Sequence, residues 1–193
     1  LAVTFVSPEI VPVIVEINDT VYINIQANDS DSLSLLIDDI LVKKVEGTEL
    51  KDTIVADQFG KYWVTAVAED MSGTVEESFH YIVREDVVIE ERPAGTKDGI
   101  NYPDDNTAIL SLIAPGKEFI YVLGDFNNWE LDPGSYMKKT PDGTRFWLEI
   151  DGLEAGKEYA YQYFIDGKLK IADPFAEKVL DPWNDPFIPE ETY

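Results

Sequence analysis

Short runs of alternating apolar and polar residues, separated by turn residues, recur along this chain and constrain its fold most. The clearest run spans residues 60–70, where Tyr62, Val64, Ala66 and Ala68 share one face. Such period-two alternation is typical of a β-strand with one buried face. No amphipathic helix longer than a turn or two is visible in the sequence. The pattern therefore predicts an all-β protein built from antiparallel strands.

The first 85 residues repeat this pattern about seven times, which predicts an antiparallel β-sandwich. Pro8 and Pro12 interrupt the first β-branched runs. Because proline cannot donate to a sheet's hydrogen-bond ladder, we expect these runs at sheet edges. The spacing of glycine, tyrosine, valine and alanine from Gly60 to Ala66 resembles the penultimate strand of immunoglobulin-like domains. In those domains the tyrosine, here Tyr62, often forms a corner.

A boundary is predicted in residues 85–97, where an acidic cluster adjoins the turn signal Arg92-Pro93-Ala94-Gly95. We therefore expect two domains, residues 1–85 and 86–193. Each is long enough to bury a core of its own. Residues 87–89 are a candidate first strand of the second domain.

The second half continues with apolar runs that are expected to be strands, at residues 108–113, 118–123, 145–150, 159–166 and 168–171. The pair Asp166-Gly167 predicts a tight hairpin, because both residue types tolerate the positive φ of its turn. The tail from Asp173 is rich in proline and is expected to be extended and irregular. The predicted fold class is all-β, with two tandem immunoglobulin-like antiparallel β-sandwiches.

The formal net charge of −23 bears on partners. Such a surface repels phosphate backbones and anionic lipids, which argues against nucleic acid as a partner. No apolar run approaches the roughly 18 residues of a membrane span. The chain has no cysteine, so disulfides and thiolate metal sites are excluded. It begins at Leu1 without a visible signal peptide, and we expect this start to be processed or cut.

No catalytic or metal-binding pattern stands out. With 38 acidic residues, some carboxylate pair falls at catalytic separation by chance, and nothing singles one out. A catalytic α/β barrel needs about 250 residues, more than this chain has. His80, the sole histidine, has no identifiable partners, and the acidic stretch 28–32 lacks the glycine and terminal glutamate of an EF-hand loop. We expect no enzymatic activity in this chain, no metal and no cofactor.

Residues 119–129 join an apolar strand to a polar turn that ends in a tryptophan. The strand breaks at Gly124, and Asp125, Asn127 and Asn128 follow, whose side chains favour turns. A large aromatic such as Trp129 at this tip is either a lid on the core or a flat platform for a ligand. The residues alone leave both interpretations open.

The second domain resembles the family-48 carbohydrate-binding module, an early-set domain that precedes the catalytic barrel in many amylase-family (glycoside hydrolase family 13) enzymes. The residues that carry this resemblance are Gly124-Asp125-Phe126-Asn127-Asn128-Trp129, Phe146-Trp147-Leu148, Gly152-Leu153 with Gly156, and Tyr161-Gln162-Tyr163-Phe164-Ile165-Asp166-Gly167. Residues 171–185 resemble the segment that follows this module in secreted amylase-like enzymes of gut bacteria.

The resemblance implies the non-catalytic N-terminal part of an α-amylase-like glycoside hydrolase. Its partner would be the catalytic barrel of the same polypeptide, which it positions. Its candidate ligand is an α-glucan such as starch, glycogen or maltooligosaccharide. A secreted, cell-surface or periplasmic bacterial location is expected. The alternative is a purely structural spacer or protein-docking module that binds no sugar.

The resemblance also implies site residues. Trp129 falls on the tryptophan that serves as a sugar platform in binding members. Gln162 stands where those members often have a lysine, and Leu169 where they often have a second tryptophan. Trp147 points outward by alternation and is a candidate replacement platform. The expected carbohydrate-binding residues are thus Trp129, Trp147, Gln162 and Asn128.

The other two tryptophans are expected to pack rather than to bind. Trp63 lies in the clearest strand and is expected to pack between strands or at the domain junction. Trp183 is expected to anchor the extended tail.

Overall fold

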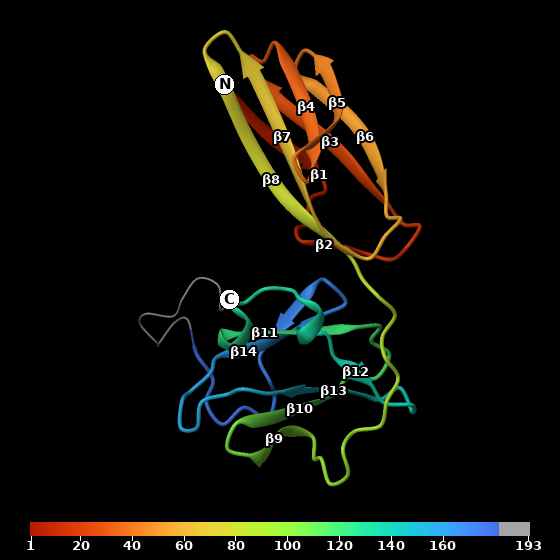
Figure 1. Cartoon of the computed structure of the whole chain (residues 1–193), viewed down its shortest axis with the longest axis vertical. Helices are drawn as coiled ribbons and strands as arrows, with labels where there is room; N and C mark the ends of the chain where they lie inside the picture. Colours follow the sequence, from red (N-terminus) through yellow and green to blue (C-terminus); the bar gives the residue numbers. More distant parts are fainter. Residues whose placement is uncertain (182–193) are drawn as a thin grey trace. The chain divides into compact units, whose positions relative to one another are not determined.

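The computed structural model describes residues 1–181, which form strands, turns and short 3-10 helices (Figure 1). The chain divides into two compact units, Leu1–Glu85 and Asp86–Tyr193. The predicted all-β class is confirmed, since no α-helix occurs in residues 1–181. Over the same residues, no helix has the length and apolar character needed to cross a membrane.

The strands of the first unit are β1 (Ala2–Ser7), β2 (Val13–Val15), β3 (Thr20–Asn28), β4 (Ser32–Ile37), β5 (Ile40–Glu46), β6 (Glu49–Val55), β7 (Gly60–Asp70) and β8 (Gly73–Val83). They form two sheets, with strand orders β1-β3-β6 and β2-β8-β7-β4-β5. As predicted, the strands beside Pro8 and Pro12 lie at sheet edges. β2 pairs with β8 in parallel, which the expectation of antiparallel strands did not include.

The core of the first unit lies between its two sheets. Alternate residues of β3 and β7 contribute buried side chains to it: Val21, Ile23, Ile25, Val64, Ala66 and Ala68. The Tyr62 hydroxyl donates to the carbonyl of Gln58 at 3.2 Å, four residues upstream. This bond forms the predicted tyrosine corner. The Tyr62 ring also stacks on Tyr81, with ring centroids 5.0 Å apart.

Trp63 lies on the outer face of β7, opposite the core. Its side chain is 49% exposed, and its ring centroid lies 5.2 Å from that of His80 on β8. The expectation that Trp63 packs between strands is therefore only partly right, because its neighbour is a cross-strand ring on an open face. Within residues 1–181, no group of three or more His, Cys, Asp and Glu side chains could hold a metal ion.

The strands of the second unit are β9 (Gly99–Asp104), β10 (Thr107–Ile113), β11 (Ile120–Gly124), β12 (Lys138–Lys139), β13 (Arg145–Ile150), β14 (Tyr161–Ile165) and β15 (Leu169–Ile171). One sheet has the order β12-β13-β10-β9, hereafter the β10 sheet, and the other β11-β14-β15, hereafter the β14 sheet. Two 3-10 turns follow β11, η1 (Asp125–Asn127) and η2 (Pro133–Ser135). The side chains buried between the sheets include Leu110, Val122, Phe146, Leu148 and Tyr163.

The strand predicted at residues 87–89 does not form. Instead, Ile89 makes an isolated parallel bridge to Lys139. The Lys139 N–H donates to the Val88 carbonyl and the Glu90 N–H to the Lys139 carbonyl, each at 2.9 Å. The backbone of the segment bridges β12 at this one residue, while the side chains of Lys138 and Glu90 pair at 2.8 Å.

The predicted hairpin at Asp166-Gly167 is confirmed. Both residues have positive φ, 50° and 66°, and Ile165 pairs with Leu169 across the turn. The Lys168 N–H donates to the Ile165 carbonyl at 3.0 Å. Asp166 adds a second function, because its Oδ1 accepts the Glu118 N–H at 2.8 Å. The turn therefore also holds the start of the neighbouring strand.

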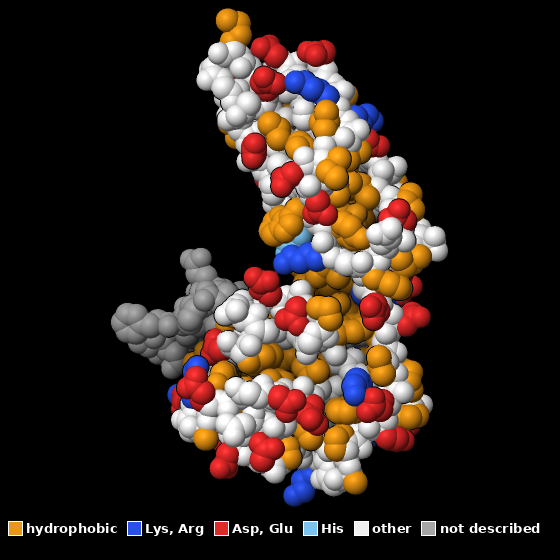
Figure 2. All heavy atoms as spheres, in the orientation of Figure 1, with side chains coloured by type: hydrophobic (Ala, Val, Ile, Leu, Met, Phe, Trp, Pro, Cys, Tyr) orange, Lys and Arg blue, Asp and Glu red, His pale blue; other side chains and the backbone are white. Residues whose placement is uncertain are grey.

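Acidic side chains are distributed over the visible face of each unit, and basic ones are few (Figure 2). This distribution follows from the 38 acidic and 15 basic residues in the sequence. Neither unit shows a broad basic patch on this face.

Candidate functional site

The turn that presents Trp129 is closed by its own side chains. The Gly124 N–H donates to Asn127 Oδ1, and Asn127 Nδ2 donates to the Val122 carbonyl, both at 2.9 Å. Asn128 and Trp129 have φ of 53° and 61°, in the left-handed region that non-glycine residues seldom adopt. The Trp129 N–H donates to the Gly124 carbonyl at 3.0 Å. These bonds stabilise a backbone path that Trp129 would not adopt by its own preference.

Asp125 links the Trp129 ring to the backbone at Ala160, just before β14. The indole Nε1 donates to Asp125 Oδ1 at 3.0 Å, and Asp125 Oδ2 accepts the Ala160 N–H at 2.8 Å. A Cβ on Gly124 would lie 2.6 Å from the Ala160 carbonyl oxygen. Glycine is therefore needed at this position for close approach, not for its φ. The half-buried indole is consequently held in one orientation before any ligand arrives.

The structure places Trp129 and Gln162 in the lining of one pocket of about 350 Å³, hereafter the Trp129 pocket. Tyr159, Lys170 and Lys178 also line it. Gln162 is only 7% exposed, and its Nε2 has no hydrogen-bond partner among the described residues. An unpaired buried amide costs about 1–3 kcal/mol.

Asn128 and Leu169 do not line the Trp129 pocket. Asn128 is exposed, and its visible role is to provide the left-handed backbone of the turn. Lys170, which the sequence analysis missed, also lines the pocket. It pairs with Phe164 and so lies on the same face of the β14 sheet as Gln162. The alternation of residues 168–171 would have indicated that Lys170 shares a sheet face with Gln162.

Trp147 is not an open platform, and the expectation that it could contact a ligand there is wrong for this structure. It does point away from the core-facing Phe146, as the alternation predicted. However, it is only 4% exposed, because residues 88–98 cross the outer face of the β10 sheet. Its Nε1 donates to the Glu90 carbonyl at 2.9 Å, and Lys138 Nζ lies 4.6 Å from its ring centroid.

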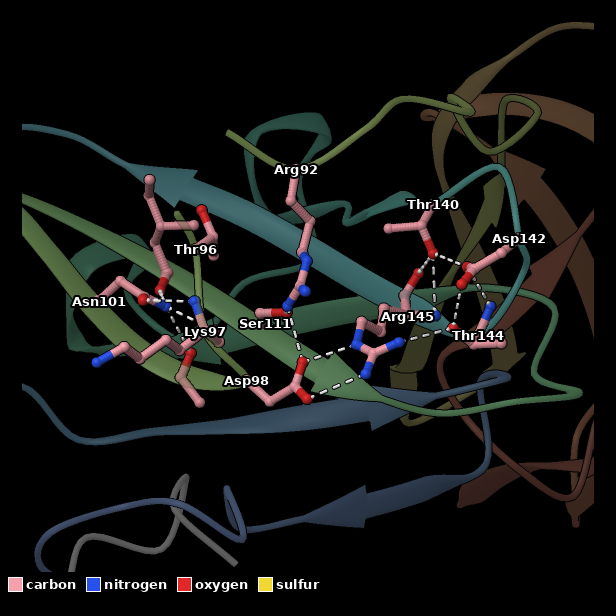
Figure 3. A network of polar contacts seen from close by, with 12 residues as sticks. Arg92, Thr96, Lys97, Asp98, Asn101, Ser111, Thr140, Asp142, Thr144 and Arg145 are labelled. Atoms are coloured by element: carbon pink, nitrogen blue, oxygen red, sulfur yellow. Dashed lines mark hydrogen bonds and ion pairs between the residues drawn. The ribbon is translucent and has the colours of Figure 1, made fainter. Parts of the chain in front are cut away.

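An ion-pair network fastens this covering segment, residues 88–98, to the sheet (Figure 3). Asp98 accepts from Arg145 at 2.7 and 3.2 Å and from Arg92 at 2.7 Å. Arg92 also donates to the hydroxyl of Ser111, a fully buried residue of β10, at 2.7 Å. Hydrogen bonds from Arg145 and then Arg92 hold the pKa of the Asp98 carboxyl below its usual value, against the opposing effect of partial burial. Bidentate pairing of this kind is among the stronger polar contacts in proteins.

Acidification is expected to release the covering segment. Because the Asp98 pKa is lowered in the folded chain, its contribution to stability is complete above the unfolded pKa of about 3.9 and is lost as the pH falls through the folded pKa. The Trp147 Nε1–H resonance, followed by NMR from pH 6 to 2, should exchange faster at the acid end. Asp98→Asn should lower the free energy of unfolding of the second unit by about 2 kcal/mol at pH 7 and flatten this profile. An unchanged acid profile in the variant would contradict this role.

A buried carboxylate anchors the segment that follows β15. Asp173 is 3% exposed, and its Oδ2 accepts the hydroxyls of Tyr161 at 2.7 Å and Tyr163 at 2.8 Å. Its Oδ1 accepts the Phe175 N–H at 2.8 Å. Burial, together with the Asp173 carboxylate, raises the pKa of both tyrosines, so both stay protonated as donors. Residues 173–181 contain no strand or helix, as predicted, while Trp183 lies outside the described residues.

The same anchor requires a glycine at the start of β9. Gly99 has φ of +92°, and a Cβ there would lie 2.5 Å from Cβ of Phe175. Gly99→Ala is expected to lower the free energy of unfolding of the second unit by about 3 kcal/mol, through backbone strain and displacement of Phe175. Gly95→Ala is the matched control, since Gly95 has φ of +88° but no atom within 4 Å of its added Cβ. Urea denaturation should show the larger loss for Gly99→Ala, and equal losses would contradict the close-contact argument.

Sequence comparison finds similarity to glucan-branching enzymes over a limited stretch. No family model matches the chain. A stretch of 68 residues, 34% of the chain, is 38% identical to the 1,4-alpha-glucan branching enzyme GlgB of Clostridium perfringens strain ATCC 13124. The branching enzyme GlgB 2 of Clostridium perfringens strain 13 matches with the same identity over the same length. The chain spans about a tenth of the length of these curated relatives.

Structural comparison finds weak similarity to β-rich modules. The fibronectin(III)-like modules of Clostridium thermocellum CbhA match with a TM-score of 0.42 and 16% identity, over 89% of this chain and 90% of theirs. The pullulanase from Anoxybacillus sp. LM18-11 matches with a TM-score of 0.35 and 13% identity, over 85% of this chain and 25% of its own. At these scores, nothing about function follows from either similarity.

Proposed function

We propose that this chain is a non-catalytic, accessory β-sandwich part of an α-glucan-acting glycoside hydrolase, and that its second unit binds α-glucan in the Trp129 pocket. The observation that carries the proposal is the meeting of Trp129 and Gln162, from two separate elements, in the lining of one open pocket. The stretch similar to branching enzymes supports α-glucan as the polymer. A secreted, cell-surface or periplasmic bacterial location belongs to the same proposal.

The chemistry of the pocket suits a neutral sugar. A glucose ring has an apolar face of C–H groups, and the held indole of Trp129 offers a flat surface with little entropy to lose. Gln162 contributes a polar amide side chain to the same lining. Lys170 and Lys178 supply further donors at the pocket lining. A neutral ligand also needs no charge partner, so a net charge of −23 does not oppose it.

In this proposal the chemical step belongs to another part of the polypeptide. Residues 1–181 form sheets and turns without the strand–helix alternation of a catalytic barrel. The first unit would contribute by spacing or positioning that barrel. Its closed core and tyrosine corner suit a rigid module for this role.

Calorimetric titration of the chain with maltoheptaose and glycogen tests the proposal. We expect saturable binding with a dissociation constant of about 1 mM or tighter. Cellohexaose, a glucose oligomer with β-linkages, is the matched control and should give no heat. The proposal fails if no α-glucan produces saturable heat, or if cellohexaose binds as well as maltoheptaose.

A purely structural spacer or docking module remains the second candidate function. It is favoured by the position of Trp147 beneath residues 88–98 and by the absence of Leu169 from the pocket lining. Under this interpretation, glucans give no heat and the aromatic residues serve packing alone. The same titration therefore separates the two functions.

A further inference from the structure

A second, larger pocket of about 510 Å³ adjoins the Trp129 pocket in the second unit. It is hereafter the Tyr102 pocket, and its lining comes from the β9–β10 hairpin, residues 153–161 and residues 176–180. The two pockets share six lining residues, Tyr159, Ala160, Tyr161, Ala176, Lys178 and Leu180. The pockets are therefore neighbours with a common wall, and both volumes fall in the range of about 300–1,000 Å³ typical of ligand sites.

Tyr159 lies in that common wall and is held in place. Its hydroxyl accepts the Glu154 N–H at 2.9 Å. Lys157 Nζ lies 4.9 Å from the ring centroid. Tyr102, which lines only the larger pocket, is 65% exposed and so presents its ring to solvent. Aromatic residues thus line both pockets, with Trp129 in one, Tyr102 in the other and Tyr159 in the lining of both.

The charge of the Tyr102 pocket restricts what could fill it. Its acidic lining residues are Asp104, Asp105, Glu154, Glu158 and Glu177, and its basic ones are Lys157 and Lys178. Lys178 pairs with Glu158 at 2.9 Å and Lys157 with Glu154 at 3.5 Å, so both positive charges are offset. An excess of carboxylates repels uronic acids and phosphorylated sugars. A neutral polyhydroxylated chain avoids this repulsion and can donate hydrogen bonds to the carboxylates.

We propose that the two pockets form one extended site, in which Tyr159 and Tyr102 continue the platform that begins at Trp129. The site would then take an α-glucan chain several glucose residues long, rather than a single sugar. This inference rests on the proposed function, because it extends the ligand already placed at Trp129. It assigns Tyr102 and Tyr159 to glucan recognition, a role that the sequence analysis did not predict.

A series of maltooligosaccharides tests the extension. Calorimetry would compare maltose, maltotriose, maltopentaose and maltoheptaose on the wild type and on the variant Tyr102→Ala. Because Tyr102 lies only in the far pocket, we expect maltoheptaose affinity to fall about fivefold and maltose affinity to stay unchanged. Tyr159→Leu keeps apolar bulk but removes the flat ring, and because Tyr159 lines both pockets it should weaken the binding of both maltose and maltoheptaose. Tyr22→Ala, at a 67% exposed tyrosine of the first unit, is the control.

The outcomes distinguish this inference from the proposed function. If wild-type binding persists and Tyr102→Ala leaves every oligosaccharide unaffected, the extension is wrong and the Trp129 pocket alone binds glucan. An equal loss for maltose and maltoheptaose in Tyr102→Ala would also overturn the extension. If the wild type binds no glucan at all, both proposals fail. Thermal unfolding of each variant shows whether a loss arises from misfolding, and the exposed position of Tyr102 makes that variant the decisive one.

Discussion

Replacing Trp129 by alanine is expected to weaken maltoheptaose binding at least about tenfold, the largest functional effect of any single substitution proposed for this chain. The substitution removes the flat surface of the Trp129 pocket, and a tenfold loss corresponds to about 1.4 kcal/mol. Asp125 already holds the indole in one orientation, so the ring loses little conformational entropy when a ligand binds. Replacing Trp129 by alanine therefore removes the contact with the ligand without saving an entropy cost. Calorimetric titration of wild type and variant measures the difference.

The matched controls are the other two described tryptophans. Trp63→Ala changes an exposed ring in the first unit and should leave affinity within about twofold of wild type. Trp147→Phe keeps most of the buried volume but loses the bond to the Glu90 carbonyl, so it should lower stability by about 1 kcal/mol without changing affinity. If Trp147→Phe reduced affinity as strongly as Trp129→Ala, the covered position of Trp147 would not describe the protein in solution.

Replacing Asp173 by alanine should cause the largest loss of stability, about 4 kcal/mol in the free energy of unfolding of the second unit. The carboxylate accepts two phenolic hydroxyls and one backbone N–H in a buried setting. Its removal leaves the half-buried Tyr161 and the buried Tyr163 as donors without this acceptor, and each such loss costs up to about 1–3 kcal/mol. Urea denaturation, with hydrogen exchange of peptides from residues 86–181, assigns the loss to this unit.

Asp105→Ala provides the control for charge, because Asp105 is an exposed carboxylate of the same unit. It should change the free energy of unfolding by less than about 0.5 kcal/mol.

Tyr163→Phe should recover part of the stability lost in Asp173→Ala when the two substitutions are combined, since the double variant removes one unpaired hydroxyl. Asp173 also lines the Trp129 pocket, so glucan affinity should fall with stability. A loss below about 1 kcal/mol for Asp173→Ala would refute the anchoring role.

Strands could be predicted from the sequence wherever apolar and polar residues alternate over a long run. β7 shows this best, because four apolar residues repeat at period two and bury one face of an eleven-residue strand. β9 and β12 were missed, since β9 carries few apolar residues and β12 has only two residues in all. β9 pairs with β10 and β12 pairs with β13, in each case the next strand along the chain. Short edge strands of this kind take their conformation from partners rather than from propensity.

The candidate site residues were also predictable only where local alternation decides their position. Alternation correctly turned Trp147 away from the core, but it could not show that residues 88–98, far earlier in the chain, cover it. The anchoring role of Asp173 was likewise missed, because Asp173 reaches Tyr161 and Tyr163 only when β15 returns antiparallel to β14. Lys170 lay within reach of sequence reasoning, through the register of the hairpin.

The sequence by itself determined the all-β class, the turn at Asp166-Gly167 and the side of each sheet to which a residue such as Trp147 points. These follow from local preferences and from the period of two along a strand. Only the tertiary structure decided which outward residues are open and which are covered, and that Trp129, Gln162 and Tyr159 line one pocket. Burial and pocket formation depend on segments that are distant in sequence and pack together in the folded sandwich. The sequence of a single strand does not show which segment will cover it.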